Sequence, residues 1–489
     1  MAIRVRSFSF LLLVLSVGAG SGGPTSRSFF AALTGATNHQ LSSEGQSELV
    51  KMVNAGRLTE LQCPNFSAYQ VPLQNFYESM GHGLVWLHDS ELTNQARELI
   101  AILQGADKKG LNPEDYDGQK WPTRVQALQG KSPESDLIRF DLALTVSAMR
   151  YVSDLHVGRV DPHEVGLDYD VDAKRINLAE FLKRNVVDTS DVAAAFQKLE
   201  PPFPEYQQTE KALEGYQEQA RDDEAAHKSL TAKIDRLELA LERWRWIPLG
   251  SAQRVIVVNI PEFQLRAYDE EYNPALTMRV LVGKANGKND TPLFGGRMRT
   301  VIFRPYWNVP PSIERAELLP RIERDPGYIA SHAYEVVDAN GRVAGGNVVS
   351  GLLSGRLGIR QRPGGHNAMG LVKFVFPNEY DVYMHDTPMV KLFSKERRDL
   401  THGCIRVQKP EDLAEWALRS NSGWSRDEIH AAMQGSRTVP VNLDSPISVF
   451  LVYMTAMADE NGDVHVFDDI YGRDEALRRA LAQRKACSG

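Results

Sequence analysis

Residues 380–407 read YDVYMHDTPMVKLFSKERRDLTHGCIRV, a stretch with strand-like sequence at both ends and a polar loop between them. The first run alternates apolar and polar residues and ends at His385, which predicts a half-buried strand. The second run begins at Cys404, directly after Thr-His-Gly at 401–403. We therefore expect two strand ends to bring a thiol and imidazole rings within reach of each other.

Cys404 has the sequence surroundings of a nucleophile. A cysteine nucleophile needs a basic or cationic neighbour, because the thiolate attacks and a free thiol is mostly protonated at neutral pH. His385 and His402 are the two candidates for that neighbour. Gly403 removes a Cβ beside the sulfur, which lets backbone N–H groups turn toward a developing oxyanion. The segment therefore predicts covalent catalysis by Cys404.

Three other interpretations fit the spacing alone. His385, His402 and Cys404 could bind zinc, although a paired short-spaced motif and a fourth ligand are missing. Cys404 could also be a small buried apolar residue in a strand. A disulfide with Cys63 or Cys487 is the third interpretation, but the adjacent glycine and the two histidines have no use in a structural bridge.

The sequence on both sides of this stretch reads mainly as β structure. Between Pro311 and Pro363 lies a polar, Gly-rich and irregular segment, far longer than a usual connection of about 4–6 residues, which is typical of a lid or binding loop. A hairpin turn is expected at Asn461-Gly462 and a closing helix at 474–484. Strands are expected at 255–258, 264–268, 276–282, 301–303, 371–376, 380–385, 404–407, 438–443 and 449–454.

The N-terminal half reads as helical. Amphipathic patterns run from about 29 to 187, and a cluster of prolines at 201–204 separates them from a second helical stretch at 206–246. In that stretch apolar residues fall on one stripe that is too short for a dimeric coiled coil, so a helical hairpin is favoured. His156 and Arg159 could contact a ligand, but a capped loop after a helix is the favoured interpretation.

Composition places the chain among globular proteins. It has 489 residues with 42% hydrophobic and 24% charged, and 56 Lys+Arg against 63 Asp+Glu give a net charge of −7. These values exclude disordered, collagen-like and multi-span membrane classes, and the length indicates two to four domains. Because no clustered basic excess is present, nucleic acid is not an expected partner.

The first residues predict export. Arg4 and Arg6 precede an apolar run at 8–17 and small residues at 18–20, and the run is shorter than the ~20 residues that a bilayer-spanning helix needs. An uncleaved tail or short anchor is the alternative. We expect location in the periplasm or cell envelope, with association with the inner membrane as a further option. Three cysteines are an odd number, so at least one thiol is expected to be free.

HDTP at 385–388 with THGCIRV at 401–407 resembles the signature of the YkuD-type L,D-transpeptidases. That family has a histidine some fifteen to twenty residues before its catalytic cysteine, and here the spacing is 404 − 385 = 19 residues. Five further segments resemble the large, scaffold-bearing subgroup of the family. They are RWRWIP from Arg243, VIVVNIPEFQL from Val255, YWNVPPSI from Tyr306, RQRPGGHNAMGLVKFVFPN from Arg360 and FDDIYGRDEAL from Phe467.

The resemblance implies a role for each residue of the motif. Cys404 would be the nucleophile and His385 its base, and the stretch that begins with Asp386 would orient the imidazole. His402 and Gly403 would shape the oxyanion pocket. Arg406 would either fix the loop or meet a substrate carboxylate. Residues 312–362 would form a capping lid, with its entrance at the turn 364–370.

The implied fold is a multidomain α+β protein, in which an all-α scaffold precedes a mainly β catalytic domain with a long lid insertion. The expected boundaries are a signal peptide at 1–20, a linker at 21–28, the helical scaffold at 29–200, a helical connector at 201–248 and the catalytic domain at 249–489. Many members of the subgroup also carry a peptidoglycan-binding module. Here 217–240 reads as one continuous charged helix, which leaves no room for that module.

The implied activity is peptidoglycan cross-linking through a cysteine thioester, with stem peptides as substrates and without a metal, another cofactor or a nucleotide. The helical domain would recruit cell-wall synthesis partners. The same site could instead serve an L,D-carboxypeptidase or a protein-anchoring transferase. A non-catalytic cell-wall scaffold is the alternative from another class of protein.

Overall fold

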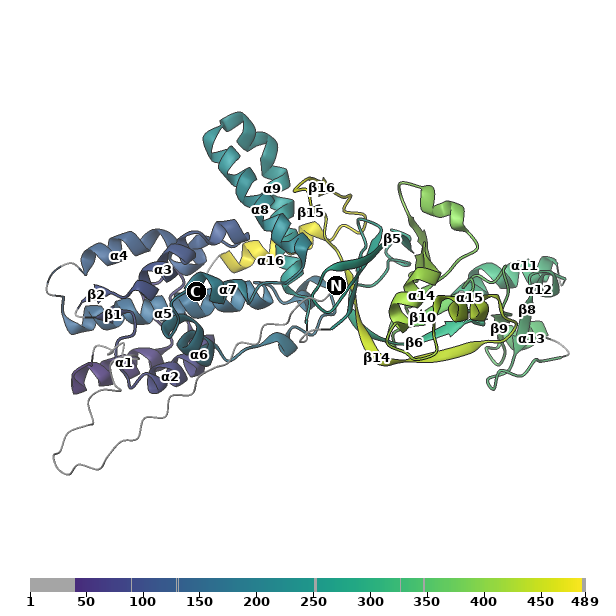
Figure 1. The fold of residues 1–489 in the computed structure, drawn as a ribbon, viewed down its shortest axis with the longest axis horizontal. Helices are drawn as coiled ribbons and strands as arrows, with labels where there is room; N and C mark the ends of the chain where they lie inside the picture. Colours follow the sequence, from purple (N-terminus) through teal and green to yellow (C-terminus); the bar gives the residue numbers. More distant parts are fainter. Residues whose placement is uncertain are drawn as a thin grey trace, which may run out of the picture.

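The computed structural model describes residues 40–485, apart from 89, 129, 131, 250–252, 326 and 346–347. The predicted signal peptide and linker, and also Cys487, lie outside the described residues. A helical region, a projecting helical hairpin and a β-rich body with the lid at its far end follow one another along the long axis (Figure 1). The expected order, helical region first and mainly β region second, is confirmed.

The helical region is built around one buried helix, α5 (Glu134–Val157). Most side chains of α5 between Leu137 and Leu155 are buried, because apolar and small residues occur on all its faces and other helices surround it. A small hairpin of β1 (Leu87–His88) and β2 (Glu91–Leu92) also packs in this region. The surrounding helices are α1 (Ser43–Ala55), α2 (Gln70–Ser79), α3 (Asn94–Gln104), α4 (Trp121–Ala127), α6 (Leu178–Phe181) and α7 (Val192–Gln197).

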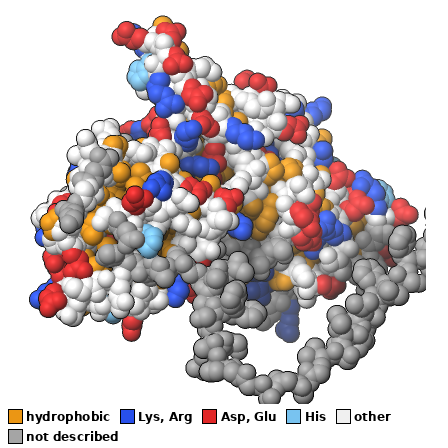
Figure 2. Space-filling model, turned by 60° about the vertical axis from the view of Figure 1, so that its left-hand side comes forward, with side chains coloured by type: hydrophobic (Ala, Val, Ile, Leu, Met, Phe, Trp, Pro, Cys, Tyr) orange, Lys and Arg blue, Asp and Glu red, His pale blue; other side chains and the backbone are white. Residues whose placement is uncertain are grey.

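The hairpin consists of α8 (Pro204–Asp222) and α9 (Glu224–Arg245), which lie side by side and project from the body (Figures 1 and 2). The predicted hairpin is confirmed, but the expectation of one continuous helix over 217–240 is wrong. Asp223 leaves the helical conformation, and its carboxylate accepts the Ala225 N–H at 2.9 Å as the N-cap of α9. A short acidic side chain favours this break because it competes with the helix for backbone N–H groups.

Buried charges join the base of the hairpin to its neighbours. Glu242 is fully buried and accepts the N–H of Val160 at 3.0 Å, and Arg159 pairs with it at 3.4 Å. His156 Nδ1 lies 2.9 Å from the Leu199 carbonyl. His156 and Arg159 therefore make structural contacts within the chain, in line with the favoured interpretation.

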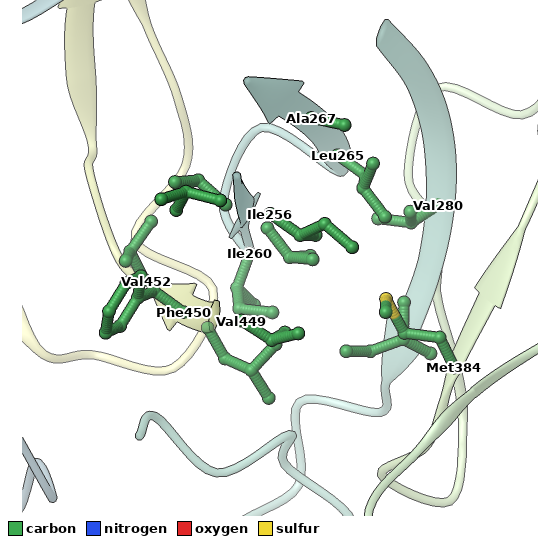
Figure 3. Packing of buried hydrophobic residues seen from close by; sticks show 14 of the residues in the cluster. Ile256, Ile260, Leu265, Ala267, Val280, Met384, Val449, Phe450 and Val452 are labelled. Carbon is green, nitrogen blue, oxygen red and sulfur yellow. The ribbon is translucent and has the colours of Figure 1, made fainter. Parts of the chain in front are cut away.

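The β-rich body is a sheet that closes on itself. Its nine strands follow the order β12-β5-β13-β11-β10-β6-β14-β3-β4, and β4 also pairs with β5, so that one continuous set of strands encloses the core. Ile256, Leu265, Val280, Met384 and Val449 meet inside it (Figure 3). The strands are β3 (Val255–Asn259), β4 (Gln264–Tyr268), β5 (Pro274–Gly283), β6 (Gly295–Phe303), β10 (Val372–Val375), β11 (Met384–His385), β12 (Asp399–Thr401), β13 (Ile405–Val407) and β14 (Val439–Val452).

Two strand expectations differ from the structure. The strands expected at 438–443 and 449–454 are one long strand, β14, because both halves pair with β6 across a register shift. The strand expected at 380–385 is reduced to β11. Asn378 folds the preceding residues into a turn by accepting the Tyr380 and Val382 N–H groups, and Asp381 adopts φ +53° there.

The C-terminal elements follow the expectations more closely. The turn at Asn461-Gly462 joins β15 (Ala456–Ala458) to β16 (Val464–Val466), and the closing helix is α16 (Asp474–Lys485). Two helices, α14 (Pro410–Leu418) and α15 (Arg426–Gln434), lie between β13 and β14 in the chain. None of the helices in the described residues is long and apolar enough to cross a membrane.

The lid has more regular structure than its sequence suggests. A three-stranded sheet in the order β7-β9-β8 packs with short helices around a small core of its own, which includes Leu318, Val336 and Ile359. The expectation of an irregular segment is therefore wrong in part, since several short elements can share one small core. They are β7 (Trp307–Asn308), α10 (Pro311–Ile313), η8 (Glu314–Leu318), α11 (Leu319–Arg324), α12 (Tyr328–Ser331), β8 (Tyr334–Val337), α13 (Val348–Leu353) and β9 (Gly358–Gln361).

Candidate functional site

Five chemistry-bearing side chains share one face of three neighbouring strands, β10, β11 and β13. His385 is paired with Lys373 on the antiparallel side and with Arg406 on the parallel side. Tyr383 and Cys404 directly precede β11 and β13, and the alternation of side chains continued by two residues puts them on the same face. The Tyr383 ring lies 5.9 Å from the His385 ring, in line with this placement. The register therefore brings together the predicted nucleophile and base, together with two cations and a phenol.

The residues that alternate with these side chains along the three strands belong to the core. Phe374, Met384 and Ile405 are fully buried and point to the interior of the sheet (Figure 3 shows Met384). A one-residue slip in register would exchange the two faces and place charges in the core. Burial of these three side chains thus fixes which face carries the candidate site.

Cys404 is free and half-buried, whereas Cys63 is in a disulfide. The disulfide interpretation of Cys404 is therefore wrong. Its Sγ donates to the Asp381 carbonyl at 3.7 Å. Burial raises the pKa of the Cys404 thiol above its usual value, against smaller opposing effects of a backbone hydrogen bond from Tyr383, the Lys373 charge and the Tyr383 hydroxyl. The resting form at neutral pH is the thiol.

His385 is buried, with 2% of its surface exposed. Its Nδ1–H donates to the Asp386 carbonyl at 2.5 Å, since a carbonyl can only accept. Burial, followed by the charges of Arg406 and Lys373, lowers the pKa of His385 to about 3. The ring is therefore neutral at neutral pH, and Nε2 is the nitrogen without a proton.

Asp386 acts through its backbone on the imidazole and through its carboxylate on the loops. The carboxylate accepts the N–H groups of Leu371 at 2.8 Å and Thr387 at 2.6 Å. Gly370 has φ +61°, and a Cβ there would lie 2.3 Å from the Asp386 carboxylate. Asp386 thus ties the end of β11 to the chain that enters β10, while its carbonyl orients the ring of His385.

The turn before Cys404 determines which backbone donors are available. Gly403 has φ +120°, and its N–H donates to Thr401 Oγ1 at 3.2 Å. Its carbonyl accepts the Thr291 hydroxyl at 2.8 Å. The Cys404 N–H has no acceptor in the part of the chain that the structure describes. Of these two N–H groups, the one of Cys404 is therefore available to an oxyanion.

His402 lies against the lid. Its Nε2 is 2.6 Å from Glu317 Oε1, in η8, and both side chains are about one-third exposed. Sequence analysis missed Glu317, which is 85 residues away from His402 and has no motif of its own. This hydrogen-bonded contact joins the lid to the turn before Cys404, at the residue two positions before the predicted nucleophile.

The entrance turn at 364–370 is held by Asn367. Its buried amide donates to the carbonyls of Gln361 at 3.2 Å and Arg362 at 2.9 Å, and its side-chain oxygen accepts the Met369 N–H at 2.7 Å. These bonds fasten the end of the lid to the turn that leads into β10, the strand that carries Lys373. They explain why an asparagine stands within this glycine-rich turn.

The two cations of the site lack acidic partners. Arg406 Nη1 contacts Met389 Sδ at 3.4 Å, and Lys373 Nζ lies 3.4 Å from the centroid of the Tyr383 ring. Neither is in an ion pair with a carboxylate among the residues described. Arg406 thus contacts the loop after β11, whereas sequence reasoning missed Lys373 and Tyr383. The only signal for Lys373 was its place within a resembling segment, and Tyr383 lies two residues before the predicted base in the stretch 380–407.

Metal binding was one interpretation of His385, His402 and Cys404. In the described range no group of three His, Cys, Asp or Glu side chains is arranged as metal ligands. His402 instead points to Glu317, and His385 Nδ1 is bound to a carbonyl. The three residues therefore do not form one ligand set.

Comparison with known proteins agrees with these observations. Residues 253–441 match the L,D-transpeptidase catalytic domain, YkuD, and residues 71–213 match the Scaffold domain. A Haemophilus influenzae protein described as "Putative L,D-transpeptidase" is 33% identical over 249 residues, which are 50% of this chain and 49% of that protein. The match thus spans about half the length of that relative. The resemblance seen in the sequence is confirmed.

Proposed function

We propose that this chain, which carries a YkuD-type L,D-transpeptidase catalytic domain and a Scaffold domain, cross-links peptidoglycan stem peptides through a thioester on Cys404. One observation carries the proposal. A free, half-buried Cys404 shares one face of the sheet with the buried and neutral His385, whose Nδ1–H is committed to the Asp386 carbonyl. A nucleophile, a base and an orienting group are the parts that covalent acyl transfer needs.

In the first step the Cys404 sulfur attacks the carbonyl of the third, L-centred stem residue. The thiol proton passes to Nε2 of His385, which carries no proton in the neutral ring. The Cys404 N–H stabilises the oxyanion. His385 then returns the proton to the departing amine, so that the C–N bond breaks and the terminal D-alanine leaves. The product is a thioester between Cys404 and the stem peptide.

In the second step an amine of a neighbouring stem attacks the thioester and restores the thiol. The new amide is a three-to-three cross-link, and the free energy comes from the peptide bond that was broken. Water as acceptor would make the enzyme an L,D-carboxypeptidase, and a protein amine would make it an anchoring transferase. The Glu317–His402 contact favours transfer, because a lid held over the thioester excludes water.

The surroundings of the reaction are part of the same proposal. Peptidoglycan lies outside the cytoplasm, so the enzyme would be exported to the periplasm or cell envelope. The helical region would bind cell-wall synthesis partners or position the glycan strand.

The test is incubation of the protein with disaccharide-tetrapeptide, followed by mass spectrometry of the protein and of the muropeptides. We expect a protein adduct equal to the donor minus alanine, together with cross-linked dimers. An adduct that yields only tripeptide would identify a carboxypeptidase or a missing acceptor. A folded protein that forms no adduct would favour the non-catalytic scaffold.

Glu317→Gln is expected to shift the products from dimer to tripeptide by about threefold, because weakening a partly exposed carboxylate–imidazole hydrogen bond worth about 0.5–1.5 kcal/mol loosens the lid. The measurement is the ratio of dimer to tripeptide at a fixed donor concentration. Glu323→Gln, an exposed lid variant, is the matched control. An unchanged ratio in Glu317→Gln would show that this contact does not keep water from the thioester.

A further inference from the structure

Lys373 is a half-buried cation without a partner. It lies in β10, next to Ile302 on one neighbouring strand and His385 on the other. Its ammonium has no hydrogen-bond acceptor or carboxylate within bonding distance in the described chain, and it lies 3.4 Å from the centroid of the Tyr383 ring. Withdrawing an unpaired charge from water is costly. Such a residue is a candidate for a functional role, especially beside a nucleophile.

Tyr383 connects Lys373 to Cys404. The Ile405 N–H donates to the Tyr383 carbonyl at 3.1 Å, which fixes Tyr383 beside the catalytic turn. The Tyr383 hydroxyl faces the sulfur, and the hydroxyl and the Lys373 charge both act to lower the pKa of Cys404 against its burial. The phenol hydroxyl is therefore placed to donate to the sulfur, and a cation lies 3.4 Å from the centroid of the same ring.

In the resting enzyme, His385 carries no positive charge that could stabilise a thiolate on Cys404. Burial and the two neighbouring cations keep the pKa of His385 at about 3, so the ring carries no charge at neutral pH. Positive charge near the sulfur must come from other side chains. The charged and titratable groups that face Cys404 from the three strands and the preceding turn are Lys373, Asp381, Tyr383, His385 and Arg406.

We propose that Tyr383 is a catalytic residue that donates its hydroxyl to the Cys404 sulfur as the thiol loses its proton, with Lys373 as the positioning residue that acts through the Tyr383 ring. The inference rests on the proposed function. As the S–H bond breaks and the proton moves to His385 Nε2, negative charge appears on the sulfur and is met by the hydroxyl and by the ammonium behind it. The phenol keeps its own proton throughout.

A competing role for Lys373 is binding of a substrate carboxylate, and the two roles differ in the free enzyme. A residue that stabilises the thiolate changes the reactivity of Cys404 without substrate. A residue that binds a carboxylate changes only the KM for an anionic donor. The test is therefore made without donor peptide, which keeps it independent of transpeptidation.

The experiment measures the rate of Cys404 alkylation by iodoacetamide, a neutral reagent, from about pH 6 to about pH 11 by peptide mass spectrometry, because the pKa of Cys404 is already raised by burial. For Lys373→Met, which keeps the side-chain volume, we expect the midpoint of the pH profile to rise by about one unit, and hence about tenfold slower alkylation at pH 7. Tyr383→Phe should shift the midpoint in the same direction. Lys373→Arg should restore most of the rate, and Lys391→Met, at an exposed lysine, should leave it unchanged.

Circular dichroism checks that each variant is folded, and Lys373→Gln replaces Lys373→Met if the latter is not. An unchanged midpoint in folded Lys373→Met or Lys373→Gln would overturn the inference. If the KM for the donor were also raised, Lys373 would bind a substrate carboxylate instead. If Cys404 is not alkylated even in the wild-type protein, the proposed function itself fails.

Discussion

Cys404→Ala is expected to lose acyl-enzyme formation completely, with activity on disaccharide-tetrapeptide reduced by more than about 10⁴-fold. The thioester cannot form without the sulfur, and no second free cysteine lies on this face of the sheet in the described chain. Protein mass after incubation with the donor measures the adduct directly. The remaining signal should equal that of a sample without enzyme.

The same variant distinguishes a catalytic cysteine from a structural one. Cys404 is half-buried, and its Sγ makes one long hydrogen bond at 3.7 Å, so the stability change should stay within about 1 kcal/mol. Thermal unfolding measures this change. A much lower melting temperature would show that Cys404 is a packing residue, and residual adduct would move the nucleophile elsewhere.

His385→Ala is expected to slow acylation by about 10³-fold at pH 7 and by much less at high pH. In the wild type, the pKa of His385 is lowered to about 3, so the neutral base is available from weakly acidic pH upward and the profile is flat around neutrality. Without the base, acylation depends on the spontaneously formed thiolate. The pKa of Cys404 is raised by burial, so the thiolate fraction grows about tenfold for each pH unit below that pKa.

The ratio of wild-type to His385→Ala rates should therefore fall about tenfold per unit between pH 6 and pH 9. Single-turnover acylation by a carbapenem-like β-lactam, followed by mass, measures both profiles. His402→Ala is the control for the second imidazole. His402 is bound to Glu317 of the lid, so its loss should leave the pH dependence of acylation close to that of the wild type. Parallel profiles for wild type and His385→Ala would transfer the role of base to His402.

Local sequence was sufficient for much of the candidate site. The alternation around His385 and the Gly403-Cys404 turn predicted two strand ends, and β11 keeps only Met384–His385 of the longer strand expected there. The register pairs His385 with Arg406, two residues after Cys404. Alternation of side chains is a local property of a strand, which is why it could be read from neighbouring residues. The projecting hairpin and the closing helix were accessible for the same reason, as helical periodicity is also local.

Other elements depended on competition between local and distant contacts. The charged stretch at 217–240 has helical periodicity throughout, but Asp223 ends one helix and caps the next. The lid sequence looks irregular because each of its elements is short, and packing around Leu318, Val336 and Ile359 is what orders them. Periodicity cannot predict a core that forms only when segments far apart in the chain meet.

The sequence by itself determined the order of a helical region and a β-rich region, the choice of Cys404 and His385 as candidate nucleophile and base, and the family resemblance that the comparisons confirm. Only the tertiary structure decided what surrounds them. The Glu317–His402 pair joins residues 85 positions apart, and Lys373 reaches the Tyr383 ring through antiparallel pairing of β10 and β11. Strand order and register set such contacts. Burial of the apolar face of the sheet decides that order and register, and the residues that make these contacts do not.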